Sequence, residues 1–222
     1  LWLQQWMGYT ATWAGVALAP VGLLAIVLSP WVGRNVARLD PRTLTTVAFV
    51  GFALVLWMRS NFNTNATVWV ILIPTVIQGA AMAFFFIPLQ SIVFSGLTPE
   101  QLPSASGMSN FVRITAGAFG TSVFTTLWDS RASLHHAQLT EQLHRGNDAA
   151  MQALARLGAS GLSPEQANAV VNRLVDQQAY TMAATDLFYL SALLFLGLIG
   201  LVWLAQPRSG SMAAAAEAGG AH

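Results

Sequence analysis

YTATWAGVALAPVGLLAIVLSPWVGRNVARLDPR, residues 9–42, is a long apolar run that ends in a compact basic cluster. No charged residue occurs between residues 1 and 33, and then Arg34, Arg38, Asp40 and Arg42 follow within nine positions. An apolar run of this length can cross a bilayer as a helix, and arginines gathered at one end are typical of the cytoplasmic side. The other apolar segments can therefore be placed and oriented relative to this one.

The composition as a whole indicates a membrane protein. Of the 222 residues, 55% are hydrophobic and only 9% are charged, whereas an ordinary soluble domain is about a quarter charged. Cysteine is absent, which excludes disulfides, a thiolate nucleophile and a cysteine-based metal site. Residue 1 is leucine and no charged region precedes the apolar run, so we expect part of a longer chain and not a signal peptide.

Five apolar segments have the length and composition of membrane-spanning helices. They lie at about residues 13–32, 44–58, 68–94, 107–128 and 187–205. Two prolines lie inside the first segment and two inside the third. Prolines at membrane depth kink helices, and neighbouring helices satisfy the freed carbonyls, which suits a protein that moves. The predicted fold is therefore an all-α, polytopic membrane protein.

About fifty more polar residues separate the fourth and fifth segments. Ser163, Pro164 and Glu165 form a typical helix start, with Ser as the N-cap and Pro at the first helical position. We expect a helical hairpin outside the bilayer, whose second helix continues directly into the fifth span. The predicted organisation is a transmembrane bundle at 1–128, a helical periplasmic insert at 129–180, a last transmembrane helix at 181–206 and a disordered cytoplasmic tail at 207–222.

The distribution of arginine orients these segments. Five spans place residues 34–42, the connector at 96–106 and the tail on one face, and the arginines of these short segments favour the cytoplasm. The arginines of the insert count for little, because long loops cross a membrane largely regardless of charge. The insert is therefore predicted to be periplasmic or extracellular.

Arg113 is the most informative polar residue within a predicted span. An ionisable residue at membrane depth is costly and usually faces a cavity or a partner; the alternative is that its side chain extends to the nearby headgroups. Asn110 lies three residues earlier and can line the same helix face. Gly117 and Gly120 follow on the same helix, and we expect them to allow close packing against a neighbouring helix.

The third span carries two amides, Gln78 and Gln90, which lie twelve residues apart and which we expect near one helix face. Three consecutive phenylalanines, including Phe85, lie between them. Amides and aromatic rings together can form an adaptable pocket for apolar ligands. The alternative is that the phenylalanines face lipid, as at least one of three consecutive rings must.

Asp186 is the only carboxylate beside a span, apart from the acids of the loops. A carboxylate at membrane depth is a candidate proton carrier, although the position at the end of the span favours a solvated acid just outside the bilayer. His135, His136 and His144 lie in the insert without a convincing further ligand, so we expect solvated helix surface and no metal site. Nucleotide-binding and hydrolase motifs are absent, which argues against an enzyme.

Several longer segments have a recognisable pattern. They are GYTATWAGVALAP from Gly8, SPWVGR from Ser29, VIQGAAMAFFFIPL from Val76, SGLTPEQLPSASGMSNFVRITAGAFGTS from Ser95, LHHAQLTEQL from Leu134 and LFYLSALLFLGLIGLVWLAQP from Leu187. This pattern resembles the EmrB-like multidrug exporters, within the fourteen-helix drug:proton antiporters of the major facilitator superfamily. The resemblance covers essentially the whole chain. It implies that residues 1–5 end the ninth helix and that the five spans are helices ten to fourteen, part of the C-terminal bundle.

The resemblance implies proton-driven export of hydrophobic compounds across the bacterial inner membrane, by two helical bundles that rock around a midplane site. In this mechanism we expect five side chains to line the central cavity and bind substrate, a hypothesis motivated by the polar groups at membrane depth: Gln78, Phe85, Gln90, Asn110 and Arg113. We expect the proton-coupling carboxylate in the missing N-terminal half of the protein, and within this chain Asp186 is the remaining candidate. The second copy of the family's cytoplasmic loop motif, which latches the two halves, consists of Gly33, Arg34, Asp40 and Arg42. Ala37 replaces an Asp of the first-half motif, which weakens the expected latch.

The implied partners are drug-like substrates, protons, the lipid bilayer, a periplasmic adaptor and an outer-membrane channel. No cofactor, metal or nucleic acid is expected. An alternative function is that of a membrane scaffold, which docks the adaptor through the insert without transport of its own. A third possibility, a membrane enzyme that acts on lipids, would need a cluster of acids, histidines or metal ligands at the interface, and the sequence contains none.

Overall fold

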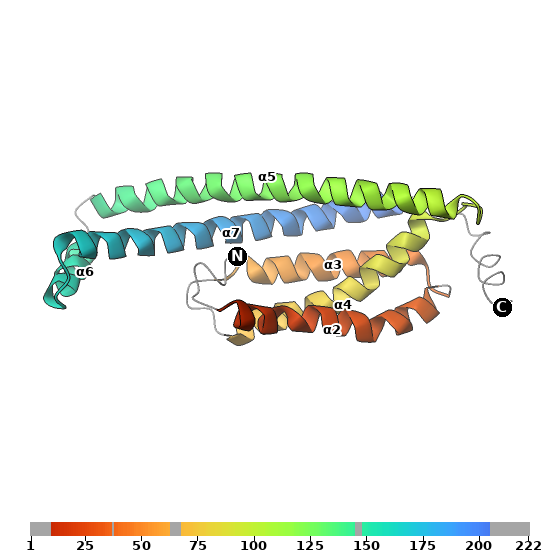
Figure 1. Cartoon of the computed structure of the whole chain (residues 1–222), viewed down its shortest axis with the longest axis horizontal. Coiled ribbons are helices and arrows are strands. Elements are labelled where there is room, and N and C mark those ends of the chain that lie inside the picture. Colours follow the sequence, from red (N-terminus) through yellow and green to blue (C-terminus); the bar gives the residue numbers. More distant parts are fainter. Residues whose placement is uncertain (1–9, 37, 63–67, 145–147, 205–222) are drawn as a thin grey trace.

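The computed structural model describes residues 10–36, 38–62, 68–144 and 148–204, which form six α-helices and no strand (Figure 1). The helices are α2 (Ala11–Asn35), α3 (Pro41–Arg59), α4 (Val68–Val93), α5 (Leu102–His144), α6 (Asp148–Ala159) and α7 (Pro164–Leu204). The fold is thus all-α, as predicted. The expectations for residues 1–5 and for the tail, and the substitution at position 37, lie outside the described residues.

Within the described part of the chain, four helices are long and apolar enough to cross a membrane. They are α2, α3, α4 and α7, which correspond to the first, second, third and fifth predicted spans. The fourth predicted span, residues 107–128, is helical but does not belong to this set. Arg113 and the many glycine, serine and threonine residues of this segment make it less apolar than the other four. The chain is a multi-pass membrane protein.

The connection between α2 and α3 follows from local chemistry. Arg34 lies in the last turn of α2, where a cation is favourable at the negative end of the helix dipole. Pro41 occupies the start of α3, and the carboxylate of Asp40 accepts a hydrogen bond from the backbone N–H of Arg42 at 2.9 Å. Proline at the first helical position and aspartate as N-cap are a favourable start for a helix. The basic cluster of the sequence is therefore a tight turn between two membrane helices.

The connection between α6 and α7 is equally well defined. Gly161 has φ +91°, and the backbone N–H of Leu162 donates to the carbonyl of Leu157, the pattern of a glycine-terminated helix. The backbone N–H of Gln166 then donates to Oγ of Ser163 at 3.2 Å, and the Gln166 side chain accepts from the Ser163 N–H at 2.9 Å. This reciprocal cap confirms the predicted helix start, and α7 runs from it without a break through the fifth span.

Aromatic rings hold the membrane helices together. Phe49 and Phe52 of α3, Phe85 of α4 and Phe195 of α7 form one cluster, with ring centroids 5.2–5.9 Å apart. The indole N–H of Trp203 on α7 also donates to the hydroxyl of Thr46 on α3 at 3.2 Å. Since α4 packs on α2 as well as on α3, the helices form a continuous row in the order α2, α4, α3, α7.

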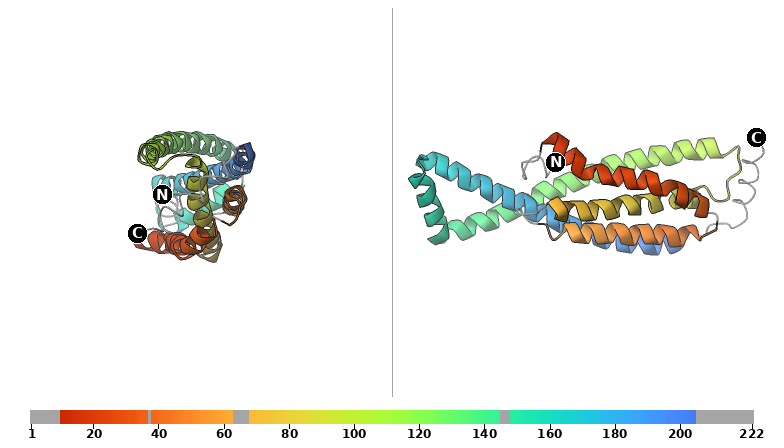
Figure 2. Two further views of the ribbon diagram at one scale, coloured as in Figure 1. Left: turned by 90° about the vertical axis from the view of Figure 1, so that its right-hand side faces the viewer. Right: turned by 90° about the horizontal axis from the view of Figure 1, so that it is seen from below.

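The helices α5 and α7 extend together beyond the other three and carry α6 at their far end (Figure 1). Seen from below, these two long helices cross each other (Figure 2). Positions 128 and 180, where we expected the bundle to give way to the insert, both lie inside continuous helices. The hairpin is therefore an outward continuation of two helices, and the division into domains stays a prediction.

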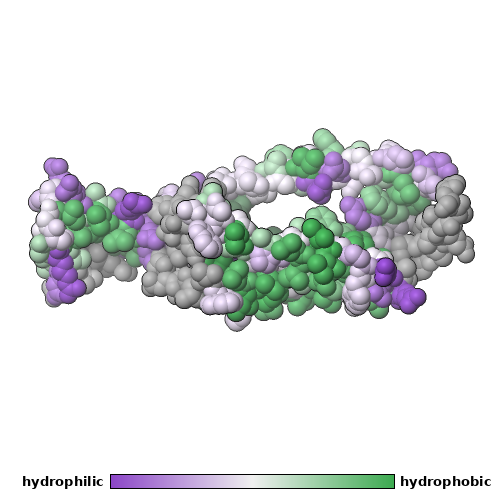
Figure 3. Space-filling model, turned by 60° about the horizontal axis from the view of Figure 1, so that its bottom comes forward, coloured by the Kyte–Doolittle hydropathy of each residue, from purple (hydrophilic) through white to green (hydrophobic). Residues whose placement is uncertain are grey.

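The first half of α5 lies apart from the row of membrane helices. The space-filling view shows an opening between them, apolar residues over α2 and α4, and hydrophilic residues at both ends of the molecule (Figure 3). Phe111 and Phe119 on this half of α5 are 64% and 71% exposed. A methyl group added at Gly117 or Gly120 would meet no atom within 4 Å. Among the described residues no helix covers that face, so the expected packing of these glycines against a neighbouring helix stays a prediction.

Close helix packing occurs instead at two glycines that the sequence did not single out. A methyl group at Gly79 of α4 would lie 2.9 Å from the carbonyl oxygens of Pro20 and Val21 and from Cβ of Leu24, all on α2. A methyl group at Gly51 of α3 would lie 3.0 Å from Cβ of Ala81 on α4. The two interfaces of α4 thus depend on the absence of a side chain at these positions.

Candidate functional site

Three of the five predicted substrate-binding residues line one open pocket between α4 and α5. Its volume is about 280 Å³, and it is lined by Gln90 and Phe94 from the end of α4 and by Ser106, Gly107, Ser109, Asn110 and Arg113 from the start of α5. The lining is mainly polar, although the neighbouring parts of α4 and α5 are rich in apolar residues. The pocket therefore collects hydrogen-bonding groups from two helices at one end of the membrane region.

The guanidinium of Arg113 is oriented by its neighbour on α5. Nη2 of Arg113 donates to Oδ1 of Asn110 at 2.6 Å. The two residues lie three apart, so the helix places them on the same face. Both side chains are exposed, and a guanidinium has five N–H donors in a planar fork. Most of these donors stay available, so the arrangement can bind an anionic or hydrogen-bond-accepting group.

Gln78 lies elsewhere. Its Oε1 accepts a hydrogen bond of 2.6 Å from Nη2 of Arg59, the last residue of α3. Our expectation that Gln78 and Gln90 share a helix face is wrong, because twelve residues at about 100° each leave them roughly a third of a turn apart. Gln78 instead links α4 to α3. In the sequence, the feature that could have indicated this hydrogen bond is Arg59, a charged residue at the end of an apolar run.

Phe85 also lies outside the polar pocket. Its ring contacts Phe49 and Phe52 of α3 in the aromatic cluster, at centroid distances of 5.9 and 5.6 Å. The two flanking rings have other surroundings: Phe84 makes an edge contact with Trp31 of α2, and Phe86 is 37% exposed and meets the Phe85 ring edge-on at 5.2 Å. Consecutive residues on a helix turn by about 100°, so the three phenylalanines face three different environments. In this structure Phe85 contributes to helix packing.

Asp186, the proton-coupling candidate, is paired with a residue that we expected to be solvated surface. Its Oδ2 lies 2.9 Å from Nε2 of His135 on α5, and the imidazole is only 12% exposed. His136 lies 3.3 Å from Asp176, with both side chains 35% exposed. The sequence offered one hint, since two adjacent histidines can reach different partners on a neighbouring helix. The partners themselves, 51 and 40 residues away, could not be identified from spacing.

The residues of the loop motif lie at the turn between α2 and α3. Gly33 and Arg34 belong to the last turns of α2, and Asp40 caps α3. Nε of Arg42 is buried and makes no hydrogen bond with any described residue. Because it caps α3, the carboxylate of Asp40 has a local structural role in addition to the predicted latch.

Replacing Asp40 by alanine should destabilise the start of α3 by about 1 kcal/mol, because the helix loses its N-cap acceptor. Asparagine retains an acceptor and serves as the matched control. The measurement is the thermal unfolding of each variant in detergent, in the full-length protein that contains this sequence. Equal stability of Asp40→Ala and the parent protein would show that the cap contributes nothing.

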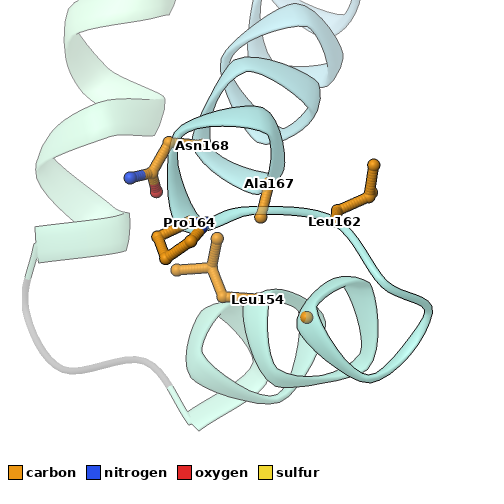
Figure 4. Close-up of a pocket in the computed structure, with 6 residues that line it drawn as sticks. Leu154, Leu162, Pro164, Ala167 and Asn168 are labelled. Carbon is orange, nitrogen blue, oxygen red and sulfur yellow. The ribbon is translucent and has the colours of Figure 1, made fainter.

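A second pocket, of about 280 Å³, lies at the tip of the hairpin where α6 meets the start of α7. Leu154 of α6 points toward Pro164 at the beginning of α7, and Ala167 and Asn168 lie one turn further on (Figure 4). Nearby apolar side chains on α6 and α7 are exposed, including Met151 at 58% and Leu174 at 57%. The tip therefore presents an apolar surface on an otherwise hydrophilic hairpin.

Among the described residues, no group of three or more histidine, aspartate or glutamate side chains is arranged to hold a metal ion. The two histidine–aspartate contacts of the hairpin are separate pairs. The candidate site is a set of polar side chains from α4 and α5, with the two histidine–aspartate pairs as a separate feature between α5 and α7.

Comparisons with known proteins agree on one group of relatives. The chain is 43% identical over 225 residues to the multidrug export protein EmrB of Escherichia coli (strain K12), covering 99% of this chain and 43% of that protein. It is 39% identical over 212 residues to EmrB of Haemophilus influenzae, covering 95% of this chain and 42% of the relative. The fatty acid resistance protein FarB of Neisseria gonorrhoeae is 36% identical over 205 residues, with 92% and 40% covered.

No protein-family model matches the chain, and no solved structure matches it. The chain spans less than half the length of the curated relatives it matches. The matched relatives are named as export and resistance proteins, and a more distant one, from Bacillus subtilis, as a transporter of the major facilitator type. The chain therefore belongs to the EmrB-like multidrug export proteins of the major facilitator superfamily.

Proposed function

We propose that this chain is part of a bacterial inner-membrane exporter of hydrophobic compounds, driven by proton influx. The observation that carries this proposal is the polar pocket between α4 and α5, into which Gln90, Asn110 and Arg113 converge. An arginine in a membrane protein is costly unless it serves a cavity or a partner. Three polar side chains from two helices line the same pocket, which favours a role in binding a ligand over three unrelated positions on the surface.

The chemistry of the pocket favours lipophilic compounds with an anionic or hydrogen-bond-accepting group. The guanidinium of Arg113 supplies charge and directional donors, and the amide groups of Gln90 and Asn110 add adaptable hydrogen bonds. The printed names of the relatives, multidrug export and fatty acid resistance, fit such a class. By analogy with these relatives, we propose drug-like molecules and fatty acids as the substrates of the exporter that contains this chain.

In the proposed cycle, the helical bundles rock around a central cavity, and Asp186 takes up the coupling proton. We propose that Gln78 and Phe85 border this central cavity in the full-length protein; in this chain Gln78 binds Arg59 and Phe85 packs in the aromatic cluster. The turn that contains Asp40 lies on the cytoplasmic side and the hairpin on the periplasmic side. This orientation rests on the arginine-rich short connections.

The hairpin is the proposed docking site for a periplasmic adaptor, which in turn meets an outer-membrane channel. Support comes from the pocket beside Leu154 at the tip and from exposed apolar side chains on the hairpin, Met151 of α6 and Leu174 of α7. The same feature favours the second candidate function, a scaffold that docks the adaptor without transport. An export assay separates the two functions, because only the exporter moves substrate.

Cells that produce the full-length protein should tolerate dodecanoate and a panel of lipophilic drugs better than control cells, and a protonophore should abolish the advantage. The reason is that export against a gradient needs the proton gradient. Susceptibility is measured with and without a sublethal protonophore, and production of the 222-residue chain alone is the control for a scaffold. Protection that survives the protonophore would contradict proton coupling, and absence of any protection would favour the scaffold.

A further inference from the structure

The crossing of α5 and α7 brings together two titratable groups whose pairing the sequence does not predict. Nε2 of His135 and Oδ2 of Asp186 are 2.9 Å apart, a hydrogen-bond distance. The imidazole is 12% exposed and the carboxylate is 44% exposed. The other ring nitrogen, Nδ1, is buried and makes no hydrogen bond with any described residue. Among the described residues, Asp186 is therefore the hydrogen-bond partner of this imidazole.

The pair lies in a seam of small side chains. Ala132 of α5 and Ala179 and Ala183 of α7 are each at most 2% exposed, so the two helix backbones approach closely here. Trp128 extends the seam, since its indole N–H donates to the carbonyl of Tyr180 at 3.0 Å. The imidazole of His135 therefore lies among small apolar side chains, while the carboxylate of Asp186 stays partly open to solvent.

The other ionisable side chains around the crossing are few. The neighbours along the two helices are Asp129, Arg131 and His136 on α5 and Asp176, Tyr180 and Tyr189 on α7, and His136 is already paired with Asp176. The other helices packed on α7 carry Arg42 and Arg59 on α3 and Arg156 near the end of α6. Of these arginines, Arg59 donates to Gln78. In the described part of the chain, Asp186 is thus the acid that His135 meets.

The position of the pair relative to the membrane is informative. Asp186 directly precedes the apolar run of residues 187–204 on α7, and His135 lies on the part of α5 that belongs to the hairpin. The pair therefore lies where the hairpin enters the bilayer. In the proposed orientation this is the outer face, from which the coupling proton comes.

We propose that His135 and Asp186 together form the binding site for the coupling proton, which deepens the proposed proton-driven export and rests on it. With a neutral imidazole and an ionised carboxylate the pair carries one negative charge. Nε2–H of the neutral imidazole already donates to the carboxylate. The incoming proton forms an N–H bond at the other ring nitrogen, Nδ1, no bond breaks, and the resulting imidazolium–carboxylate pair is neutral overall. Neutralisation lowers the cost of moving the pair toward the hydrocarbon, so binding of the proton biases the α5–α7 crossing toward the inward-releasing arrangement.

The test measures proton release when substrate binds, because an antiporter exchanges one for the other. The full-length protein is purified in detergent and mixed, in weak buffer at about pH 6.5, with tetraphenylborate, a lipophilic anion that does not itself titrate. This pH lies in the range in which an imidazole changes charge. An indicator dye reports released protons, and equilibrium dialysis of the same sample reports bound anion. Micelles without protein give the background.

We expect proton release per bound anion to fall about tenfold or more in His135→Gln and in Asp186→Asn, the scale of coupling between linked sites. His136→Gln, the adjacent histidine, is the matched control and should release protons as the parent protein does. The exchanged pair, His135→Asp combined with Asp186→His, should recover release, since the same two groups again face each other.

The outcomes separate the two proposals. Parent-level release in either single variant, or failure of the exchanged pair to recover it, overturns the assignment of this site. A parent protein that binds the anion without releasing protons contradicts proton-driven export itself. Loss of proton release in both single variants while they still bind the anion, with recovery in the exchanged pair, supports the site.

Discussion

Arg113→Ala in the full-length protein should lower proton-driven export of dodecanoate by about tenfold or more, equivalent to roughly 1.4 kcal/mol or more of lost binding. The substitution removes the one cationic group that lines the pocket and leaves Oδ1 of Asn110 without its 2.6 Å donor. Export is measured as uptake of the labelled acid into inside-out membrane vesicles energised by a proton gradient.

Two controls make this result specific. Arg113→Lys keeps the charge but not the planar fork, so it should retain part of the activity. Arg156→Ala changes an exposed arginine at the tip of the hairpin and should leave uptake unchanged. Full proton-coupled uptake by Arg113→Ala would overturn the assignment of the pocket as the substrate site.

Gly79→Leu should prevent stable packing of α2 on α4, and Gly79→Ala should destabilise the protein by about 1–3 kcal/mol. Even one methyl group would lie 2.9 Å from two backbone carbonyl oxygens of α2 and from Cβ of Leu24. None of these atoms is the free end of a flexible side chain, so the helices must separate. The loss of packing exceeds the gain in helix propensity, which is about 1 kcal/mol for alanine over glycine.

The measurement is the apparent melting temperature of the full-length protein in detergent. Gly22→Ala is the matched control, because it changes a glycine on α2 where an added methyl group would meet no atom within 4 Å. It should be neutral or slightly stabilising. A melting temperature for Gly79→Ala at or above that of the parent protein would show that α2 and α4 do not approach each other as described.

Much of the fold was predictable because its causes are local. The start of α3 at Pro41 and the continuous α7 from Pro164 follow from caps that involve residues at most three positions apart. Four of the five predicted spans are helices apolar enough to cross a membrane. The fourth predicted span, residues 107–128, is helical but less apolar, since Arg113 and its small polar neighbours lower its mean hydropathy.

The candidate site was predictable only in part. Periodicity correctly placed Asn110 beside Arg113, since the two share one helix. The expectation for Gln78 and Gln90 was wrong because helical periodicity itself separates them by about a third of a turn. Their partners depend on which helix covers each face of α4: Gln78 meets Arg59 of α3, and Gln90 meets the start of α5.

The sequence by itself determined that this protein is a helical, multi-pass membrane protein and where its helices begin, because hydrophobic runs and helix caps act over a few residues. Only the tertiary structure decided that Gly79 is a contact point and that His135 faces Asp186. The physical reason is that both depend on the crossing of helices far apart in the chain. The residues 9–42 that indicate a membrane helix do not specify which glycine its Pro20 will meet.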